Sequence, residues 1–332
     1  MTVIRLGIIG AGAMARHHIQ QILKQTDTTQ ITAICEPNKE NYHKAAELFE
    51  RAGHPVPPCE PDFDKFLKKY AKHIDAGFII TPHNQHFPQA KALLEAGKDV
   101  LVEKPMVMNA KEAKRLIKVR DKSGRVLAVA FNGSMSPTVR KAAEMLRSGE
   151  MGAVLTVSAN VWQEWEQFTR GQWRQDPKIS GGGFMFDTGA HLLNTVADVL
   201  GEPFTEVAAF IDKRQTKVDI LTVAIARTAS GALITIHGCG AAPVTDSDVK
   251  VFCENGVIQL GVWGDYLKVQ MRGEPHLKPV NLPPSLGVWE TFVRVLRGEI
   301  ENPSPAENGL RMIQLWDAIK KSAKRGGEPV EI

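Results

Sequence analysis

A glycine-rich turn near the N-terminus constrains the fold of this chain more than any other feature. Residues 3–9 form a short apolar run, which is typical of a strand that is buried on both faces. The run ends in GAGAMA at residues 10–15, and apolar residues at helical spacing follow it. A GxGxxA pattern between a strand and a helix is the dinucleotide-binding fingerprint of a Rossmann fold. The sequence therefore predicts an N-terminal domain that binds a dinucleotide.

Each residue of the fingerprint has an expected role. Gly10 allows the tight turn, Gly12 lets the pyrophosphate approach the backbone, and Ala15 keeps the helix close to the sheet. The first N–H groups of the helix, at the positive end of its dipole, point towards the phosphates. We therefore expect the cofactor-binding turn to be formed by Gly10, Gly12, Ala13, Met14 and Ala15.

An acidic residue after the second predicted strand indicates which dinucleotide binds. The strand at 31–35 ends at Glu36, about twenty residues after the fingerprint, where a carboxylate accepts hydrogen bonds from the ribose hydroxyls of the adenosine. The same carboxylate would repel the 2′-phosphate of NADP. Lys39 is three residues further along the chain, and its positive charge could offset the repulsion of that phosphate. The pattern favours NAD and leaves NADP as the less favoured cofactor.

Strands and helices continue to alternate after this point. Apolar patterning predicts strands at 76–80, 100–102 and 126–130, with helices near 39–52, 62–71 and 109–122 and one that ends at Gly97. Such alternation indicates an α/β fold with a doubly wound parallel sheet, which binds ligands at the carboxyl ends of its strands. Two polar segments at 81–86 and 103–105 fall at those ends. They supply the remaining expected cofactor contacts, which are Thr81, Pro82, Asn84, His86, Glu103 and Lys104.

A second polar pattern stands at the start of a predicted helix within 181–201. Asp187 and His191 are four residues apart, about one helical turn, so their side chains would project from the same face. A carboxylate beside an imidazole at a glycine-rich helix entrance is suited to moving a proton. The alternative interpretation is a helix with one polar face and no chemistry.

Composition excludes several other classes of function. The 332 residues carry 41 Lys and Arg against 37 Asp and Glu, and this surplus is not gathered into the basic stripe of a nucleic-acid-binding protein. Four scattered cysteines form no CxxC pair, so we expect neither disulfides nor a metal site. No apolar run is long enough to span a membrane, and the chain opens on a predicted strand rather than a signal peptide. We therefore expect a cytoplasmic protein that acts on a small molecule.

Five motifs in this order resemble the Gfo/Idh/MocA family, which includes glucose–fructose oxidoreductase and inositol dehydrogenase. They are GAGAMA, TPHNQH at 81–86, GKDVLVEKP at 97–105, WRQDPKISGGG at 173–183 and DTGAH at 187–191. The resemblance implies a Rossmann domain at 1–129. It also implies an α/β domain at 130–332, built on a large, open, mostly antiparallel sheet. A homodimer or homotetramer that associates through the open face of that sheet is expected.

The resemblance also implies roles for three side chains. Lys104 would contact both the substrate hydroxyl and the nicotinamide, and its bond to Pro105 is expected to be cis. Asp187 and His191 would bind the hydroxyl that is oxidised, with His191 as the proton acceptor. These roles suit the chemistry, because a hydroxyl that loses a hydride from its carbon becomes acidic and needs a base within hydrogen-bond reach.

The chain departs from the family pattern at residues 130–142. Many members carry an Asn or Gln followed by two arginines there; this chain keeps Asn132, which we expect to bind substrate, but then has Gly133, Ser134 and Met135. The change predicts a roomier and more neutral pocket wall, which argues against a sugar acid or a phosphosugar.

Tryptophans are concentrated in residues 162–175, which hold three of the six in the chain. Trp165 could stack on a sugar ring and Arg174 could bind its hydroxyls. Core filling is the alternative for both. Short runs rich in Val, Ile and Thr between about 153 and 271 then predict a series of antiparallel strands.

Together the residues and the resemblance predict NAD-dependent oxidation of a secondary hydroxyl of a sugar, polyol or inositol-like substrate. One alternative is an NADP(H)-dependent reductase of a related carbonyl compound, against which Glu36 argues. The other is a non-catalytic NAD-binding sensor, which would have no need of Lys104, Asp187 and His191.

Overall fold

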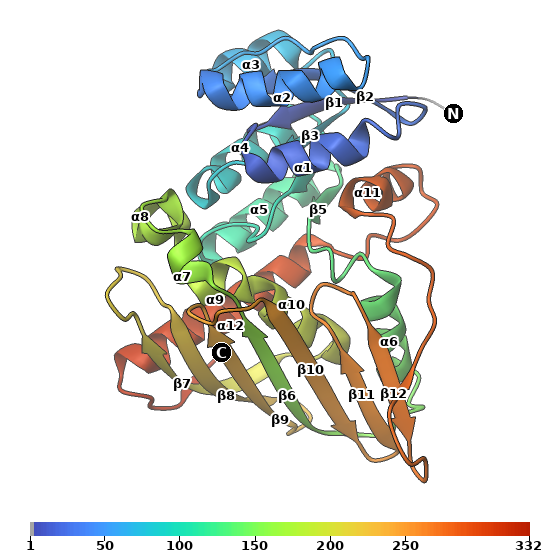
Figure 1. Ribbon diagram of the computed structural model, residues 1–332, viewed down its shortest axis with the longest axis vertical. Helices are drawn as coiled ribbons and strands as arrows, with labels where there is room; N and C mark the ends of the chain where they lie inside the picture. Colours follow the sequence, from blue (N-terminus) through green and yellow to red (C-terminus); the bar gives the residue numbers. More distant parts are fainter. Residues whose placement is uncertain (1–2) are drawn as a thin grey trace. The chain divides into compact units, whose positions relative to one another are not determined.

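The computed structural model describes residues 3–332, which fold into two compact units (Figure 1). The first unit runs up to Val107 and also contains Lys111–Ala130 and Leu286–Ala306. The second contains Met108–Ala110, Phe131–Ser285 and Glu307–Ile332. Each unit is built on one sheet and has its own apolar core.

The sheet of the first unit has five parallel strands in the order β2-β1-β3-β4-β5. The strand bounds are β1 Ile4–Ile9, β2 Thr29–Cys35, β3 Ala76–Ile79, β4 Asp99–Val102 and β5 Leu127–Val129. The strand order reverses direction at β1 and β3, which defines the switch point of a doubly wound sheet. The loops that follow β1 and β3 therefore flank the crevice in which such folds bind ligands, and the predicted α/β fold is confirmed.

Helices connect these strands at the predicted places. They are α1 Ala13–Ile22, α2 Lys39–Arg51, α3 Phe63–Tyr70, α4 His83–Glu95 and α5 Ala110–Ser123. Local capping explains two of the starts, since the Asn38 side chain accepts from the amides of Glu40 and Asn41, and Asp62 accepts from that of Lys65. Crossovers of one hand on either side of the switch point place these helices on both faces of the sheet.

A segment near the C-terminus completes the first unit. The sequence predicts that residues 286–306 belong to the second domain, but α11 (Val288–Leu296) packs on the Rossmann sheet. The Trp289 ring stacks on Phe78 at 6.1 Å, and its Nε1 donates to Thr29 Oγ1 at 2.8 Å. Burial of the apolar face of α11 holds this segment in the first unit. The predicted domain boundary at 129–130 rests on local patterns, which do not show that a later segment returns to the first unit.

The second unit contains a nine-stranded sheet in the order β13-β12-β11-β10-β6-β9-β8-β7-β14. Its neighbours pair antiparallel except β6 with β9, which confirms the predicted large, mostly antiparallel sheet. The bounds are β6 Val154–Trp162, β7 Phe204–Asp212, β8 Leu221–Thr228, β9 Leu233–Cys239, β10 Asp246–Cys253, β11 Gly256–Leu260, β12 Leu267–Met271, β13 Lys278–Pro279 and β14 Val330–Glu331.

One face of this sheet is covered by helices. They are α6 Pro137–Arg147, α10 Gly189–Leu200 and α12 Ala306–Lys324, with the short α7 Trp165–Phe168, α8 Pro177–Ser180 and α9 Phe184–Asp187 and a 3₁₀ turn at Trp173–Gln175. Contacts of α6 with β11 and β12, α9 with β8 and β9, and α10 with β6 bury the inward side chains. Figure 1 shows α10 and α12 behind the strands.

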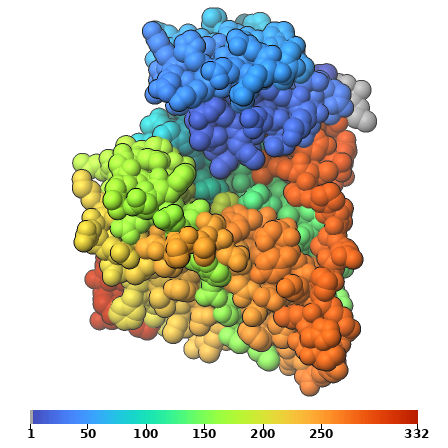
Figure 2. Space-filling view, in the orientation of Figure 1, coloured from blue at the N-terminus to red at the C-terminus, as the bar shows by residue number. Residues whose placement is uncertain are grey.

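The other face of the sheet is exposed. Residues alternate strictly along β8, with Val223 and Ile225 outward and Ala224 and Ala226 in the core. Figure 2 shows the strands at the surface on this side, where no described helix of the second unit lies over them. Among the described residues no helix is long and apolar enough to cross a bilayer.

Candidate active site

The turn after β1 has the geometry of a dinucleotide-binding loop. Gly10 has φ +98°, and a Cβ there would lie 2.6 Å from the carbonyl oxygen of Ile80, so a larger residue is excluded. Gly12 caps α1, and a Cβ placed on it would meet no atom within 4 Å. Ala15 is fully buried against the sheet, while Ala13 and Met14 are exposed at the start of the helix. The turn leaves open the close approach to backbone that a pyrophosphate needs.

Glu36 is fixed beside this turn. It follows β2 directly and is buried, and its Oε2 accepts a 2.6 Å hydrogen bond from the amide of Ala11 while its Oε1 accepts from that of Asn38 at 2.8 Å. Two backbone donors orient the carboxylate before any ligand binds. This is the position in which a carboxylate recognises the adenosine ribose, so the residues fit a dinucleotide cofactor.

The segment after β3 combines a helix start with a buried histidine. Thr81 and Pro82 precede α4, Asn84 lies in its first turn, and Thr81 Oγ1 donates to Gln89 Oε1 at 2.7 Å. The His86 ring is completely buried, with Nδ1 2.8 Å from the Pro105 carbonyl oxygen and Nε2 2.9 Å from that of Thr81. His86 thus joins the loops that follow β3 and β4. Desolvation lowers its pKa, although the two carbonyl oxygens act in the opposite direction.

Glu103, Lys104 and Pro105 follow β4, and the peptide bond between Lys104 and Pro105 is cis, as predicted. The Glu103 carboxylate is buried, accepts from the Lys104 amide at 3.1 Å, and lies 2.7 Å from Nε2 of His18 on α1. It therefore links the first helix to the loop that carries Lys104. The sequence predicts Glu103 as a cofactor contact and places His17 and His18 on the first helix near the cofactor-binding turn, but it does not predict that His18 contacts Glu103.

In the second unit a buried carboxylate is held by two residues of the tryptophan-rich segment. Asp187 ends α9, and its Oδ2 accepts from Trp165 Nε1 at 2.9 Å and from Arg174 Nε at 3.1 Å. Trp165 is only 1% exposed and its ring lies against Phe184. The ring therefore offers no open face for a sugar, and core packing combined with a hydrogen bond to Asp187 replaces the expected stacking role.

His191 lies in the first turn of α10, one helical turn after Asp187. Its ring is half-buried between two aromatic rings, Phe131 at 6.1 Å and Trp263 at 6.3 Å, both edge-on. Trp263, on the turn after β11, was not anticipated from the sequence, because it stands 72 residues further along the chain than His191 and in no recognisable pattern.

A second buried carboxylate anchors the helix that carries Asp187. Asp219, just before β8, is 4% exposed; its Oδ1 accepts from the Gly183 amide at 2.5 Å and its Oδ2 from the Met185 amide at 2.7 Å. The Phe184 amide donates to the Asp219 carbonyl oxygen at 2.9 Å. A Cβ on Gly183 would lie 2.8 Å from the Asp219 nitrogen, which explains the glycine. Burial raises the pKa of Asp219.

The segment after Ala130 packs against α10. Gly133, Ser134 and Met135 are buried, Ser134 Oγ accepts from Asn194 Nδ2 at 2.8 Å, and a Cβ on Gly133 would lie 3.1 Å from Thr195 Oγ1. Gly133 and Ser134 thus contact α10, and the segment carries no charge. The half-buried Asn132 keeps an Oδ1 that has no hydrogen-bond partner among the described residues.

The candidate site residues form one group in each unit. The first unit assembles the fingerprint, Glu36 and the loops after β3 and β4, which include Lys104; the second assembles Asp187, Trp165 and Arg174, with His191 on the next helix. Across residues 3–332 no three His, Cys, Asp or Glu side chains form a group that could hold a metal ion. All four cysteines are unbridged.

Two family models match the chain in the order of its units. The model described as an oxidoreductase family with an NAD-binding Rossmann fold matches residues 4–131, and the Gfo/Idh/MocA C-terminal domain matches residues 139–259. Inositol 2-dehydrogenase 4 of Saccharopolyspora erythraea is 26% identical over 269 residues, which are 78% of this chain and 73% of that protein. D-xylose 1-dehydrogenase (NADP(+)) of Haloarcula marismortui is 27% identical over 195 residues, 58% of this chain and 53% of that protein.

Solved structures share the fold along the whole chain. Levoglucosan dehydrogenase, in complex with NADH and levoglucosan, aligns over 100% of both chains with a TM-score of 0.85 and 22% identity. The inositol dehydrogenase homolog from Azotobacter vinelandii, complexed with NAD+, aligns over 100% of this chain and 98% of its own with a TM-score of 0.85 and 18% identity. The resemblance drawn from the five motifs is confirmed: the chain belongs to the Gfo/Idh/MocA family of oxidoreductases.

Proposed function

We propose that this protein is an NAD-dependent dehydrogenase that oxidises a secondary hydroxyl of a neutral sugar, polyol or inositol-like compound. The observation that carries the proposal is the Asp187 carboxylate, which two donors hold in place one helical turn before His191. A sensor would need to bind a ligand but would not need an oriented carboxylate beside a titratable imidazole. The names of the inositol and xylose dehydrogenase relatives support the substrate class.

The cofactor would be held by residues of the first unit. The open turn at Gly12 and the first amides of α1 suit the pyrophosphate, and the oriented Glu36 suits the adenosine ribose. Ala13, Met14, Thr81, Pro82 and Asn84 would complete the contacts. When bound, the nicotinamide accepts the hydride. The negative charge at Glu36 favours NAD; the NADP in the name of the xylose dehydrogenase relative keeps an NADP(H)-dependent reductase as the second candidate.

His191 would accept the proton of the reacting hydroxyl, and Asp187 would orient that hydroxyl. The Lys104 ammonium would stabilise the negative charge that develops on the oxygen as the hydride leaves. Arg174 and Trp165 would act by keeping the Asp187 carboxylate in one orientation. The unpartnered Asn132 Oδ1 would accept from a further substrate hydroxyl. The neutral 132–135 segment supports a substrate without an acidic group.

The first test is NADH formation by the purified protein across a panel of hexoses, pentoses, polyols and inositols. Turnover on one subset would support the class and define the stereochemistry. If no compound of the panel supports NADH formation but NAD still binds, the non-catalytic sensor is favoured. Absence of both turnover and NAD binding would contradict the proposal as a whole.

A substitution then tests the mechanism. His191→Asn should lower kcat by about 10²–10⁴-fold, the usual contribution of a general base, and leave the Kd for NAD nearly unchanged. Asn keeps a polar side chain of similar reach but does not titrate. If NAD affinity and turnover fall together, the histidine has a structural role and the assignment of His191 as the base is wrong.

A further inference from the structure

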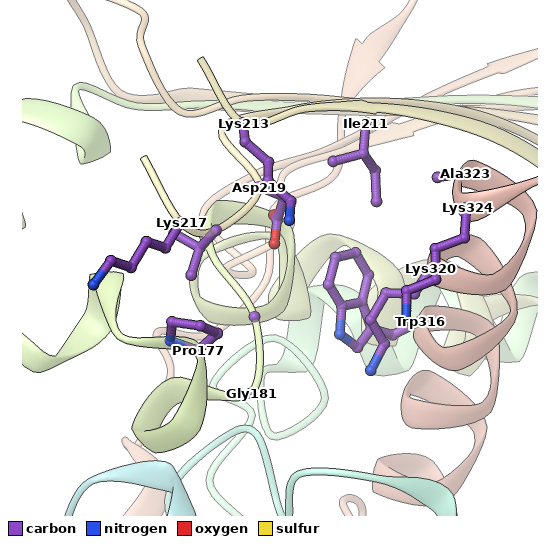
Figure 3. A pocket seen from close by; sticks show the side chains of 12 residues that line it. Pro177, Gly181, Ile211, Lys213, Lys217, Asp219, Trp316, Lys320, Ala323 and Lys324 are labelled. Atoms are coloured by element: carbon purple, nitrogen blue, oxygen red, sulfur yellow. The ribbon is translucent and has the colours of Figure 1, made fainter. Parts of the chain in front are cut away.

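A pocket with a cavity of about 240 Å³ lies within the second unit, among groups that the proposed reaction does not use (Figure 3). Three segments form it: the first residue of α8 with the glycines that follow this helix, the end of β7 with its connection to β8, and the C-terminal half of α12. The volume is below that of typical drug-sized sites, so it suits a small metabolite.

Positive charge dominates the pocket. Four lysines line it, Lys213, Lys217, Lys320 and Lys324, against one acidic residue, Asp219. The Asp219 carboxylate is already engaged by the amides of Gly183 and Met185. Lys320 pairs with Asp317 at 2.9 Å, whereas Lys213 and Lys324 have no ion pair within the described part of the chain. In Figure 3 the Lys217 side chain extends away from the other three.

An unsatisfied buried donor also lines the pocket. Trp316 is 1% exposed, and its Nε1 has no hydrogen-bond partner among residues 3–332. An indole N–H can only donate, and leaving such a group buried without an acceptor is unfavourable. Figure 3 shows the indole nitrogen on the ring edge towards Gly181. A Cβ on the adjacent Gly182 would lie 3.0 Å from Trp316 Cζ2, so a glycine keeps this edge accessible.

We propose that this pocket binds a small organic oxyanion, a phosphate ester or polycarboxylate, whose oxygens accept hydrogen bonds from the Trp316 indole N–H and the ammonium groups of Lys213, Lys320 and Lys324. An oxyanion is the ligand class that satisfies both observations, because it supplies acceptors for the indole and negative charge for the lysines. A lysine ammonium sits on a flexible side chain and, unlike the planar guanidinium of arginine, does not require one geometry of the anion. The pocket can therefore accommodate either type of anion.

The site adjoins the supports of the helix that carries Asp187. The Trp316 ring stacks on Phe186 of α9 at 5.8 Å, and Asp219 binds the first amides of that helix. A ligand here would therefore contact the two groups on which the position of α9 depends.

The test is titration of the full-length protein with glycerol 3-phosphate, with citrate and with neutral glycerol at constant ionic strength. Saturating NAD is present, so that the first unit's phosphate-binding turn is blocked. Calorimetry measures affinity, and the ¹⁵N-indole NMR signals identify Trp316 through its loss in Trp316→Phe. Saturable binding of at least one anion, with a shift of the Trp316 signal and none with glycerol, is expected. Comparing the two anions shows which type is preferred.

Two pairs of variants distinguish anion binding in this pocket from nonspecific attraction of anions by surface lysines. Lys213→Ala/Lys324→Ala should weaken binding about tenfold, the loss of roughly 1.4 kcal/mol. The matched pair Lys118→Ala/Lys321→Ala removes the same charge from exposed lysines outside the pocket and should leave affinity unchanged. The proposed site would be contradicted if both pairs of variants lowered the affinity for the anion equally. It would also be contradicted if no anion bound at millimolar concentration, or if an anion bound without a shift of the Trp316 signal. None of these readouts depends on turnover, so they are independent of the proposed dehydrogenase activity.

Discussion

At the scale of single residues, buried carboxylates organise both units, and each is oriented by two hydrogen-bond donors. Glu36 accepts from Ala11 and Asn38, and Asp187 accepts from Trp165 and Arg174. Charge-assisted hydrogen bonds of this kind are stronger than neutral ones and fix geometry as well as energy. A carboxylate pinned in this way can act on a ligand without reorganising, which is why these residues carry the proposals about cofactor and chemistry.

The Glu36 carboxylate sets the expected cofactor preference. Glu36→Gln keeps an oxygen acceptor for one of the two amides but removes the charge that repels a 2′-phosphate, so the preference in kcat/KM for NAD over NADP should narrow about tenfold or more. Glu36→Ser should narrow it too, with an additional loss of stability of about 1–3 kcal/mol from the unpaired amides. Steady-state kinetics with both cofactors measures the ratio, and an unchanged ratio in both variants would remove Glu36 from the cofactor site.

The buried His86 predicts a pH dependence of stability. Its folded pKa is lowered, mainly by desolvation, so below the ordinary pKa of about 6.5 the unfolded chain binds more protons than the folded one. Its contribution to stability is therefore complete above that pKa and is lost as the pH falls below it. Urea denaturation on the acid and alkaline sides of this pKa should show a smaller difference for His86→Gln than for the wild type. The exposed His73→Gln is the control and should leave the difference unchanged.

At the scale of elements, α9 is too short to be stable alone and depends on tertiary anchors. Helices of four residues do not form in isolation, because nucleation is unfavourable. Here three successive amides, from Gly183 to Met185, bind to Asp219, and Asp187 is held from the other side. The sequence pattern predicted a helix start in this region but not what stabilises it.

Asp219→Asn therefore tests whether this anchor matters for activity. The amide offers one acceptor where two donors need one each, so stability should fall by about 1–3 kcal/mol. If Asp219 positions α9, kcat should fall while the Kd for NAD stays near the wild-type value. Urea denaturation, single-turnover kinetics and NAD titration measure the three quantities. The exposed Asp64→Asn should change none of them. Normal kcat in Asp219→Asn would show that α9 keeps its position without the second acceptor.

At the scale of the whole molecule, the second unit leaves one face of its sheet uncovered by the described chain. Apolar side chains are exposed on several strands of that face: Phe210 lies opposite Val223, and Ile225, Leu233 and Phe252 are exposed on β8, β9 and β10. Exposed apolar surface of this kind marks interaction sites. The face fits association between copies of this chain, and we keep the homodimer or homotetramer as a proposal.

Ile225→Lys tests this association. A charge at the centre of a self-complementary apolar face would be buried twice in a two-fold dimer, which is unfavourable, so the mass in solution should fall towards 36.5 kDa. Light scattering after size exclusion measures the mass. Ile300→Lys places the same change on an exposed residue of the first unit and should preserve the wild-type mass. A wild-type protein already at the monomer mass would contradict the proposed association.

The sequence by itself determined the class of fold, the dinucleotide fingerprint and the five motifs that identify the family. These are short-range signals: a strand, a glycine turn and a helix within residues 3–22, or two polar residues one helical turn apart, are set by local sterics and periodicity. Expected bounds such as 39–52 for a helix agree with α2 because its cap, Asn38, is local.

Only the tertiary structure decided which polar groups pair in the core. His18 meets Glu103 across 85 residues, Asp219 meets Gly183 across 36, and Trp289 meets Thr29 across 260. No local pattern encodes such pairs, because they arise when apolar burial brings distant segments together and each buried polar group must then find a partner. For the same reason Trp165, whose sequence context suited stacking on a sugar, became a core residue that supports Asp187.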